Sequence, residues 1–211
     1  MPADGQVIPL RQRANDPAFA HCRAVLDYWD MLRDGRVMPL RSEVDPRGMT
    51  AALDHVFVLQ RIAPGVARFR LAGLHLNDVL GFEVRGLPLT ALFASDQRRV
   101  LADTVEAMFS TPETLELDLV RDGDGAAAPA RMILAPLRSD LGDASRAIGC
   151  LVAPGAQGEG MGSLSIRGAL RTDLLTGQTS GGLAAATGAE PIRAKAPDQP
   201  ARPVHLRLVK D

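Results

Sequence analysis

Two histidines in the central part of the chain, His55 and His75, carry side chains that could do chemistry near neutral pH. An imidazole titrates in that range and can bind a metal ion or hydrogen-bond a ligand. Asn77 could offer a further hydrogen bond, or it could simply cap local backbone groups. We expect His75 and Asn77 to line a small ligand pocket together with the aromatic side chains of Phe57 and Phe69. For His75, exposure on the surface of a helical turn is the alternative.

The sequence contains no pattern typical of a catalytic centre or a metal site. Ser95 and Ser110 have no histidine within their local motifs, and there is no G-x-S-x-G nucleophile motif. No G-x-G-x-x-G follows a strand, and residues 122–125 are too short for a calcium-binding loop. The only two cysteines, Cys22 and Cys150, have neither metal-site spacing nor the pattern of a disulfide framework. We therefore expect no catalytic residue, no metal and no enzymatic activity.

The composition is that of an ordinary globular protein of 211 residues, with 46% hydrophobic and 23% charged residues. The formal net charge of -1 gives no general attraction to nucleic acid or to a membrane surface. Residues 1–6 lack the basic and apolar regions of a signal peptide, and no apolar run approaches the roughly 18 residues that span a bilayer. We expect a cytoplasmic protein with reduced thiols, and neither nucleic acid nor membrane as a partner.

The residues around His75 are predicted to form a hairpin followed by a short helix. Residues 55–62 are rich in β-branched and aromatic side chains, and residues 66–72 alternate apolar and basic ones, with a Pro-Gly turn between them. Residues 74–80 are predicted to form one or two helical turns that end at Gly81 in the left-handed conformation. This helix and the glycine-bounded loop after it would form a lid over the sheet. Ordinary turn glycines are the alternative interpretation.

The first helix is predicted to begin near Pro17 and to end at Asp34 and Gly35. Its large residues recur at three- and four-residue steps, and it carries the only tryptophan of the chain. A stripe of this size must be covered by the sheet or by another copy of the helix. Leu26 and Trp29 are therefore candidate contacts with a partner or a second protomer, and packing in the core is the alternative.

The rest of the folded part is predicted to contain a helix that begins near Ser95, followed by three strands. The strands are expected at residues 115–119, 131–138 and 147–152. In the first of them the leucines alternate with Glu116 and Asp118, so both carboxylates are expected to face water. With the hairpin, these strands predict an α+β fold, a five-stranded antiparallel sheet with helices on one face.

One domain is predicted at residues 17–153, between a lead-in of residues 1–16 and a tail of residues 154–211. The tail contains no aromatic residue, and it cannot bury enough apolar area to offset ordering costs of about 1–2 kcal/mol per residue. We expect a low-complexity, mostly disordered tail, in which residues 163–171 could form a transient helix. The alternating residues 204–209 could add a strand to a sheet edge, and a short apolar segment of the tail without such a role is the alternative. Deletion of the tail should then leave thermal unfolding nearly unchanged.

Four short motifs follow one another in this order of elements. They are the helix segment 25–33 with its leucines and tryptophan, a proline and aspartate connector at 39–46, Arg70-Leu-Ala-Gly73, and a paired-glycine loop from Gly81 to Gly86. The arrangement resembles the PAS domain superfamily, and more closely a bacterial group of short single-domain PAS-like proteins. This resemblance implies a sensory or regulatory module that holds a ligand between sheet and helices, or binds a partner through the outer face of the sheet.

The resemblance also allows two cofactor types to be compared with the sequence. The flavin photoreceptor type carries a cysteine in an Asn-Cys-Arg motif on a pocket helix, whereas Cys22 and Cys150 belong to the first helix and the last predicted strand. The haem oxygen-sensor type has a histidine on the long helix, and residues 95–109 contain none. Both types are disfavoured, and the sequence does not identify the ligand.

Three hypotheses about function follow. The leading one is a cytoplasmic regulatory module that binds a small ligand or a protein partner, a second copy included, and signals through protein contacts. The alternatives are a small enzyme on a cone-shaped α+β fold, with proton transfer in an apolar pocket, and an adaptor without a ligand. An empty pocket with polar groups would support the sensor, a filled interior the adaptor, and a buried pair of acids the enzyme.

Overall fold

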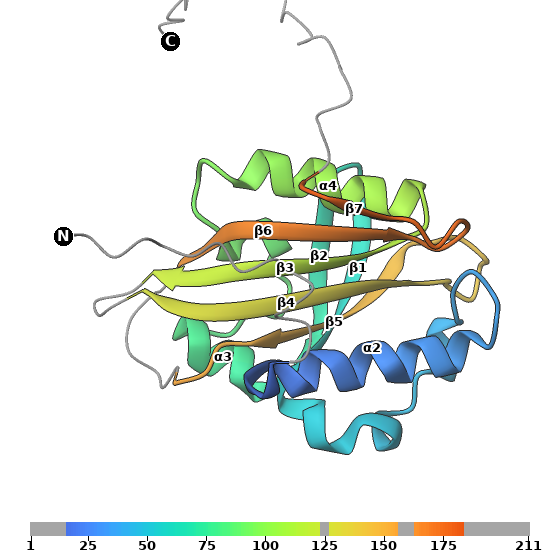
Figure 1. Cartoon of the computed structure of the whole chain (residues 1–211), viewed down its shortest axis with the longest axis horizontal. Coiled ribbons are helices and arrows are strands. Elements are labelled where there is room, and N and C mark those ends of the chain that lie inside the picture. The colour runs from blue at the N-terminus through green and yellow to red at the C-terminus, as the bar shows by residue number, and fades with distance from the viewer. Residues whose placement is uncertain (1–15, 123–126, 156–162, 184–211) are drawn as a thin grey trace, which may run out of the picture.

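The computed structural model describes residues 16–122, 127–155 and 163–183, which form an antiparallel sheet covered by helices (Figure 1). The strands are β1 (Val56–Ala63), β2 (Val66–Ala72), β3 (Glu113–Asp122), β4 (Ala128–Leu137), β5 (Arg146–Val152), β6 (Ser163–Asp173) and β7 (Thr179–Gly181). The helical elements are η1 (Pro17–Phe19), α2 (Ala20–Arg33), η2 (Arg41–Glu43), η3 (Pro46–His55), α3 (Leu74–Leu80), η4 (Leu89–Leu92) and α4 (Arg98–Ser110). The strand order is β2-β1-β5-β4-β3-β6-β7, and all neighbours run antiparallel. The predicted α+β class is confirmed.

The sheet has seven strands, two more than the five predicted from the sequence. β6 pairs with β3 along its whole length, and its Leu164 is fully buried. Residues 163–171 are therefore a strand rather than a transient helix, and the sheet continues past residue 153, where the tail was expected to begin. The reason is tertiary, because β3 supplies the hydrogen-bonding partner that this weakly patterned segment needs. Residues 204–209 lie outside the described part of the chain.

Two separate hydrophobic clusters lie on opposite faces of the sheet, because successive strand residues point to opposite sides. On one face, Met132 and Leu134 of β4 join the inner cluster, which α3, η4 and α4 complete. On the other face, Ile133 and Ala135 join the α2 cluster, which α2 and η3 complete. Helical elements thus cover both faces of the sheet, where one face was expected, and α2 and α4 lie on opposite sides of it (Figure 1).

The hairpin and the short helix after it form where the sequence predicts them. α3 ends at Gly81, which has the left-handed φ of 75°. A Cβ atom on Gly73, at the junction of β2 and α3, would lie 2.3 Å from the backbone oxygen of Asp54, so this tight junction requires glycine. The loop after α3 returns to β2, where the Phe69 backbone pairs with the Gly86 N–H and the Leu87 oxygen.

The helix α2 packs its apolar stripe against its own sheet. Asp16 caps the preceding turn by accepting a hydrogen bond from the Ala18 N–H, and Asp34 ends α2 with a φ of 45°. Val25 and Trp29 are buried in the α2 cluster. The sheet therefore covers the stripe that the sequence assigned either to the sheet or to a second copy. Among the described segments, no helix combines the length and apolar character needed to cross a membrane.

Candidate functional site

The space between the sheet and α3 is filled by apolar side chains. Phe57 and Phe69 are 0% exposed, and their rings meet edge to face with centroids 5.2 Å apart. The Phe57 ring lies directly against β5, because a Cβ atom added to Gly149 would be 2.3 Å from its Cζ atom. The structure therefore places both aromatic pocket candidates in the packed inner cluster.

Asn77 hydrogen-bonds to the backbone of the loop that follows α3. Its Oδ1 accepts a hydrogen bond from the Val84 N–H at 3.3 Å, and its backbone oxygen accepts one from the Gly81 N–H at 2.7 Å. These contacts hold the loop against the end of α3. These two hydrogen bonds are of the local capping kind that was the alternative for Asn77, and its contact with a ligand stays a prediction.

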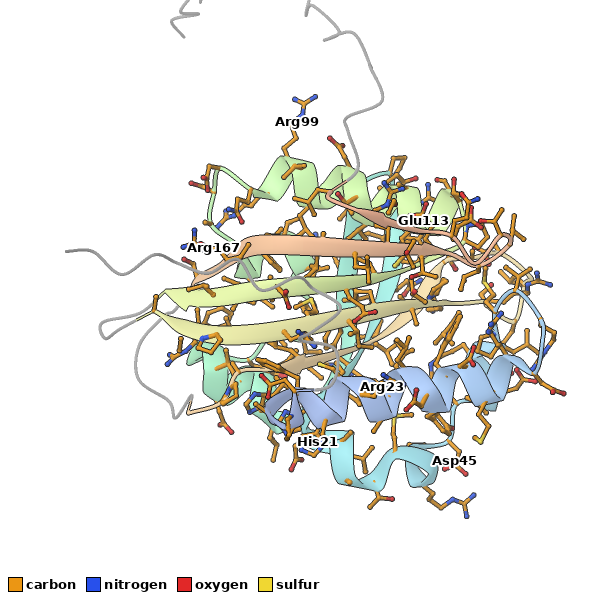
Figure 2. All side chains as sticks on the ribbon, in the orientation of Figure 1. His21, Arg23, Asp45, Arg99, Glu113 and Arg167 are labelled. Carbon is orange, nitrogen blue, oxygen red and sulfur yellow. The ribbon has the colours of Figure 1, made fainter. Side chains whose placement is uncertain are left out.

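His75 lies in a stack of three imidazole rings from three elements, which we call the three-histidine stack. The ring centroids of His75 and His55 are 4.2 Å apart, and those of His55 and His21 are 4.4 Å apart. His21 comes from the start of α2 (Figure 2), His55 ends η3 and His75 lies on α3. The stack connects the helix on one face of the sheet to the short helix on the other.

Backbone groups near the end of β5 fix two rings of the stack. The Ala153 N–H donates to Nε2 of His75 at 3.1 Å, so that nitrogen is unprotonated. Nδ1 of His55 lies 3.3 Å from the backbone oxygen of Leu151. Burial, followed by repulsion from His55, lowers the pKa of His75 to about 4, and burial followed by repulsion from His21 lowers the pKa of His55. His55 and His75 are therefore neutral at pH 7.

The described residues also bear on metal binding at the stack. Within residues 16–122, 127–155 and 163–183, no group of three or more His, Cys, Asp or Glu side chains is arranged to hold a metal ion. The rings of His21 and His55 are stacked with an interplanar angle of 19°, and those of His55 and His75 are tilted by 51°.

Of the two candidate interface residues on α2, one is buried and one lines a groove. Trp29 is 2% exposed, and its Nε1 donates to the backbone oxygen of Pro136 at 2.8 Å. Leu26 is half-buried and lines a groove of about 290 Å³ between α2 and the sheet. We call it the α2 groove, and the residues of its lining that matter below are Arg23, Leu26, Glu116, Arg131, Ile133 and Thr172.

Glu116 and Asp118 do not face open water, contrary to the expectation from the sequence. Asp118 is 8% exposed and accepts hydrogen bonds from Nε and Nη2 of the buried Arg131 at 3.1 and 3.0 Å. Glu116 is half-buried in the α2 groove, where burial raises its pKa although the nearby Arg131 opposes this shift. The physical reason is that α2 borders this face of β3, where its residues line the groove together with Glu116, and that β4 places Arg131 directly beside Asp118.

A second, apolar concavity lies beside η3, on the same face of the sheet as α2. We call it the η3 hollow; its volume is about 220 Å³, and its lining includes Arg41, Val44, Met49, Leu53, Val58 and Leu71. Leu53 is 38% exposed and Leu71 is 52% exposed. Leu74, next to Gly73 of the lining, is 67% exposed. Large apolar side chains therefore remain accessible to water around this hollow.

A family model described as a PAS domain matches residues 19–152, which is more than half of the chain. The chain belongs to the PAS domain family. The match covers the elements from α2 to β5 and ends before β6, the strand that the sequence did not predict.

Several solved structures are similar to this PAS domain. The light-state LOV domain of the blue-light photoreceptor Aureochrome1 is 15% identical, with 51% of this chain and 86% of that chain covered and a TM-score of 0.39. An RNA-binding light-oxygen-voltage receptor is 17% identical, with 72% and 36% covered and a TM-score of 0.37. A sensory box histidine kinase/response regulator from Burkholderia thailandensis E264 is 18% identical, with 52% and 85% covered and a TM-score of 0.34. No curated protein matches the chain.

The two cysteines of this PAS domain lie together in the α2 cluster. Both are free and buried, and the Cys22 Sγ is 3.7 Å from the backbone oxygen of Cys150. The hydrogen bond with Cys22 and burial raise the pKa of the Cys150 thiol, which therefore stays protonated. Neither thiol belongs to the inner cluster under α3.

The sequence did not indicate the stack or the groove. His21, His55 and His75 have no regular spacing, and their rings meet only because three elements converge at the end of β5. For the groove, one signal was available: Asp118 and Arg131 are opposite charges on two consecutive predicted strands, which suggests a cross-strand pair.

Proposed function

We propose that this PAS domain is a regulatory module that acts by binding a protein partner through the η3 hollow. The PAS fold is that of sensory and regulatory modules, and it is compatible with this role. The observation that carries the proposal is the group of exposed leucines around an apolar hollow, next to an interior that is already filled. Contiguous apolar surface on a folded domain typically marks an interaction site.

The packed interior favours partner binding over a ligand held under α3 and over the enzyme hypothesis. A ligand under α3 would have to displace Phe57 and Phe69, which are fully buried and in mutual contact. Such a rearrangement would disturb the core of the domain. The enzyme hypothesis predicts a buried pair of carboxyl groups. The buried Asp118 carboxylate instead forms an ion pair with Arg131. The filled interior thus supports the adaptor among the alternatives.

The residues also support the expectation that the flavin-cysteinyl and haem types do not apply. A flavin adduct needs a thiol on the pocket side, and Cys22 and Cys150 lie in the α2 cluster on the other face. The long helix α4 contains no histidine for a haem iron. We place the protein in the cytoplasm, where two unpaired, buried thiols would stay reduced.

The lining of the η3 hollow indicates what the partner presents. Leu53 and Leu71 are 38% and 52% exposed, so burial of their remaining surface by a partner would contribute about 1 kcal/mol each. Arg41 lines the same hollow, and no ion pair to it is found among the described residues. The partner segment therefore carries a large apolar side chain that fills the hollow and an acidic residue that faces Arg41.

The Leu71→Glu variant tests this proposal, with Leu175→Glu as its matched control. Leu175 is 66% exposed in the turn between β6 and β7, so both variants add one charge at an exposed leucine. The immobilised full chain and both variants are incubated with an extract of the source cells, and bound proteins are quantified by mass spectrometry. We expect a protein retained by the wild type and by Leu175→Glu, and reduced at least tenfold by Leu71→Glu.

The two possible identities of the partner are separated by sedimentation velocity. A dimer that Leu71→Glu abolishes and Leu175→Glu preserves would identify the partner as a second copy. Capture of the same proteins by Leu71→Glu and by the wild type would contradict the proposal, and so would a wild-type chain that binds neither itself nor any protein above the bead control.

A further inference from the structure

The α2 groove is a second concavity, and polar side chains line much of it. α2 covers β4 and β5 through Val25 and Trp29, while β3 and β6 continue beyond the helix. The groove lies between them along α2, and its lining includes Arg23, which Figure 2 labels on this helix. Its volume of about 290 Å³ is at the small end of the range for ligand sites.

Most of the charged groups at the groove are already compensated by a neighbour. On α2, Arg23 pairs with Asp27 at 2.9 Å, and Arg33 pairs with Asp30 at 2.5 Å. On the sheet, the buried Arg131 pairs with Asp118 at 3.0 Å. Each of the three arginines thus has one carboxylate as its partner.

Glu116 is the carboxylate that remains. Among the described residues it forms no ion pair within 4.0 Å, and it is half-buried between α2 and the strands. The groove lining contains three arginines and three carboxylates, those of Asp27, Asp30 and Glu116, and the partner of Arg131, Asp118, lies outside the lining. Glu116 is therefore the one carboxylate of the lining that forms no ion pair with a described residue, and it is the group that a cation entering the groove would meet.

The surroundings of Glu116 are apolar on two sides. Ile133 lies directly opposite Glu116 on β4, and Leu170 lies directly opposite it on β6. Leu26 of α2 and Leu174 after β6 also line the groove. At one end, the neighbouring pair Thr114 and Thr172 brings two hydroxyl groups to the lining.

From this arrangement we propose that the α2 groove is a binding site for a small organic monocation, a primary ammonium or guanidinium group on a short apolar body. The cationic head pairs with the Glu116 carboxylate, and the apolar body lies against Leu26 and Ile133. A charge-assisted hydrogen bond in a partly water-excluded groove is stronger than the same bond in open solvent. This site is separate from the η3 hollow, and it does not depend on the partner proposed there.

Titration of the full chain with n-butylguanidinium tests the site, with the neutral isostere N-butylurea as the ligand control. Amide chemical shifts in two-dimensional NMR report both the affinity and the location. We expect saturable shifts at Glu116, Ile133 and Thr172 with the cation, and at least tenfold weaker binding of the urea. Equal binding of the two compounds, shifts confined to other parts of the chain, or no saturable shift at all would overturn the proposal.

Two variants test whether the Glu116 carboxylate is the group that binds the cation. Glu116→Gln keeps the shape of the side chain and removes an ionised group from a half-buried position, so it should fold and bind the cation at least tenfold more weakly. Glu83→Gln removes one charge at an exposed position and should bind within twofold of the wild type. Unchanged affinity in Glu116→Gln would overturn the proposal.

Leu170→Lys supplies the cation from within the chain. Its ammonium group would lie across from Glu116 in the strand register and pair with that carboxylate. We expect this variant to unfold cooperatively and to lose n-butylguanidinium binding while Glu116 is still present. A Leu170→Lys variant that folds and binds the cation as the wild type does would also overturn the proposal.

Discussion

At the scale of single residues, the three-histidine stack makes the stability of this PAS domain depend on pH. The pKa of His75 is about 4 in the folded chain, mainly because of burial, and an unfolded imidazole titrates near 6.5. Asp54 and Asp78 oppose this lowering of the pKa but do not outweigh it. The folded state thus binds fewer protons than the unfolded state in this range. The contribution of His75 is complete above pH 6.5 and is lost as the pH falls toward 4.

We predict that His75→Gln reduces this loss of stability in acid. Glutamine keeps an acceptor for the Ala153 N–H but does not titrate. Because His75 is only part-buried and solvent screens its interactions, we expect the wild type to lose about 1–2 kcal/mol more than the variant between pH 7 and pH 5. Urea unfolding at the two pH values measures the difference. Identical losses in both proteins would show that His75 is not the titrating group.

A second prediction concerns the buried pair of Asp118 and Arg131. Asp118→Ala leaves the Arg131 guanidinium buried without its carboxylate, and we expect the free energy of unfolding to fall by about 3 kcal/mol. The double variant Asp118→Leu with Arg131→Met replaces both charges by apolar groups and should recover most of this loss. Guanidinium chloride unfolding compares the three proteins. A free energy of unfolding of Asp118→Ala within about 0.5 kcal/mol of the wild-type value would contradict the importance of this ion pair for stability.

At the scale of elements, the inner cluster depends on close contact between β1 and β5. Phe57 lies directly across from Gly149 in the register, and its ring occupies the space that a side chain at residue 149 would need. The backbone oxygen of Ile133 is also near, 2.9 Å from the position of an added Cβ atom. The Phe57 ring can therefore occupy this position only while residue 149 has no side chain.

We predict that Gly149→Ala destabilises the domain by about 1–3 kcal/mol, since the buried Phe57 ring has to move out of its place. Gly181→Ala is the matched control, because no atom lies within 4 Å of an added Cβ there and the backbone is not left-handed. Thermal unfolding of both variants measures the effect. Equal unfolding temperatures for the two would show that the inner cluster adapts to the extra methyl group.

The elements that the sequence predicts correctly are those with a strong local signal. The stripe of α2, the Pro-Gly turn of the hairpin and Gly81 at the end of α3 each contain their own start or stop residue. β6 has no such signal, since Gly168 interrupts its apolar pattern and no aromatic residue is present. Its structure comes from pairing with β3, which lies far away in the sequence. The sequence also did not predict that Glu116 is half-buried, because the residues around it belong to elements that lie far away in the sequence.

At the scale of the whole molecule, the position of β6 reverses the expectation for removal of residues 154–211. We now predict that truncation after residue 153 strongly destabilises the domain, because β3 loses its neighbour and the core loses the buried Leu164. Truncation after residue 183 keeps β6 and β7 and should keep the cooperative transition. Thermal unfolding followed by circular dichroism compares both with the full chain. Equal unfolding temperatures for the full chain and for the chain truncated after residue 153 would contradict this prediction.

The two edges of the sheet have a further consequence for the molecule at high concentration. At one edge, the loop after α3 occupies the Phe69 N–H and C=O groups of β2. At the other edge, β7 pairs with residues 170–172 of β6, while the Ala94 N–H and the Gln97 side chain occupy the Leu164 oxygen and the Ile166 N–H. Long free strand edges are the templates on which chains add to one another and aggregate. Because both edges are covered or short, we expect this domain to have little tendency to form edge-to-edge β-assemblies at high concentration. This holds even though apolar side chains remain exposed on its faces.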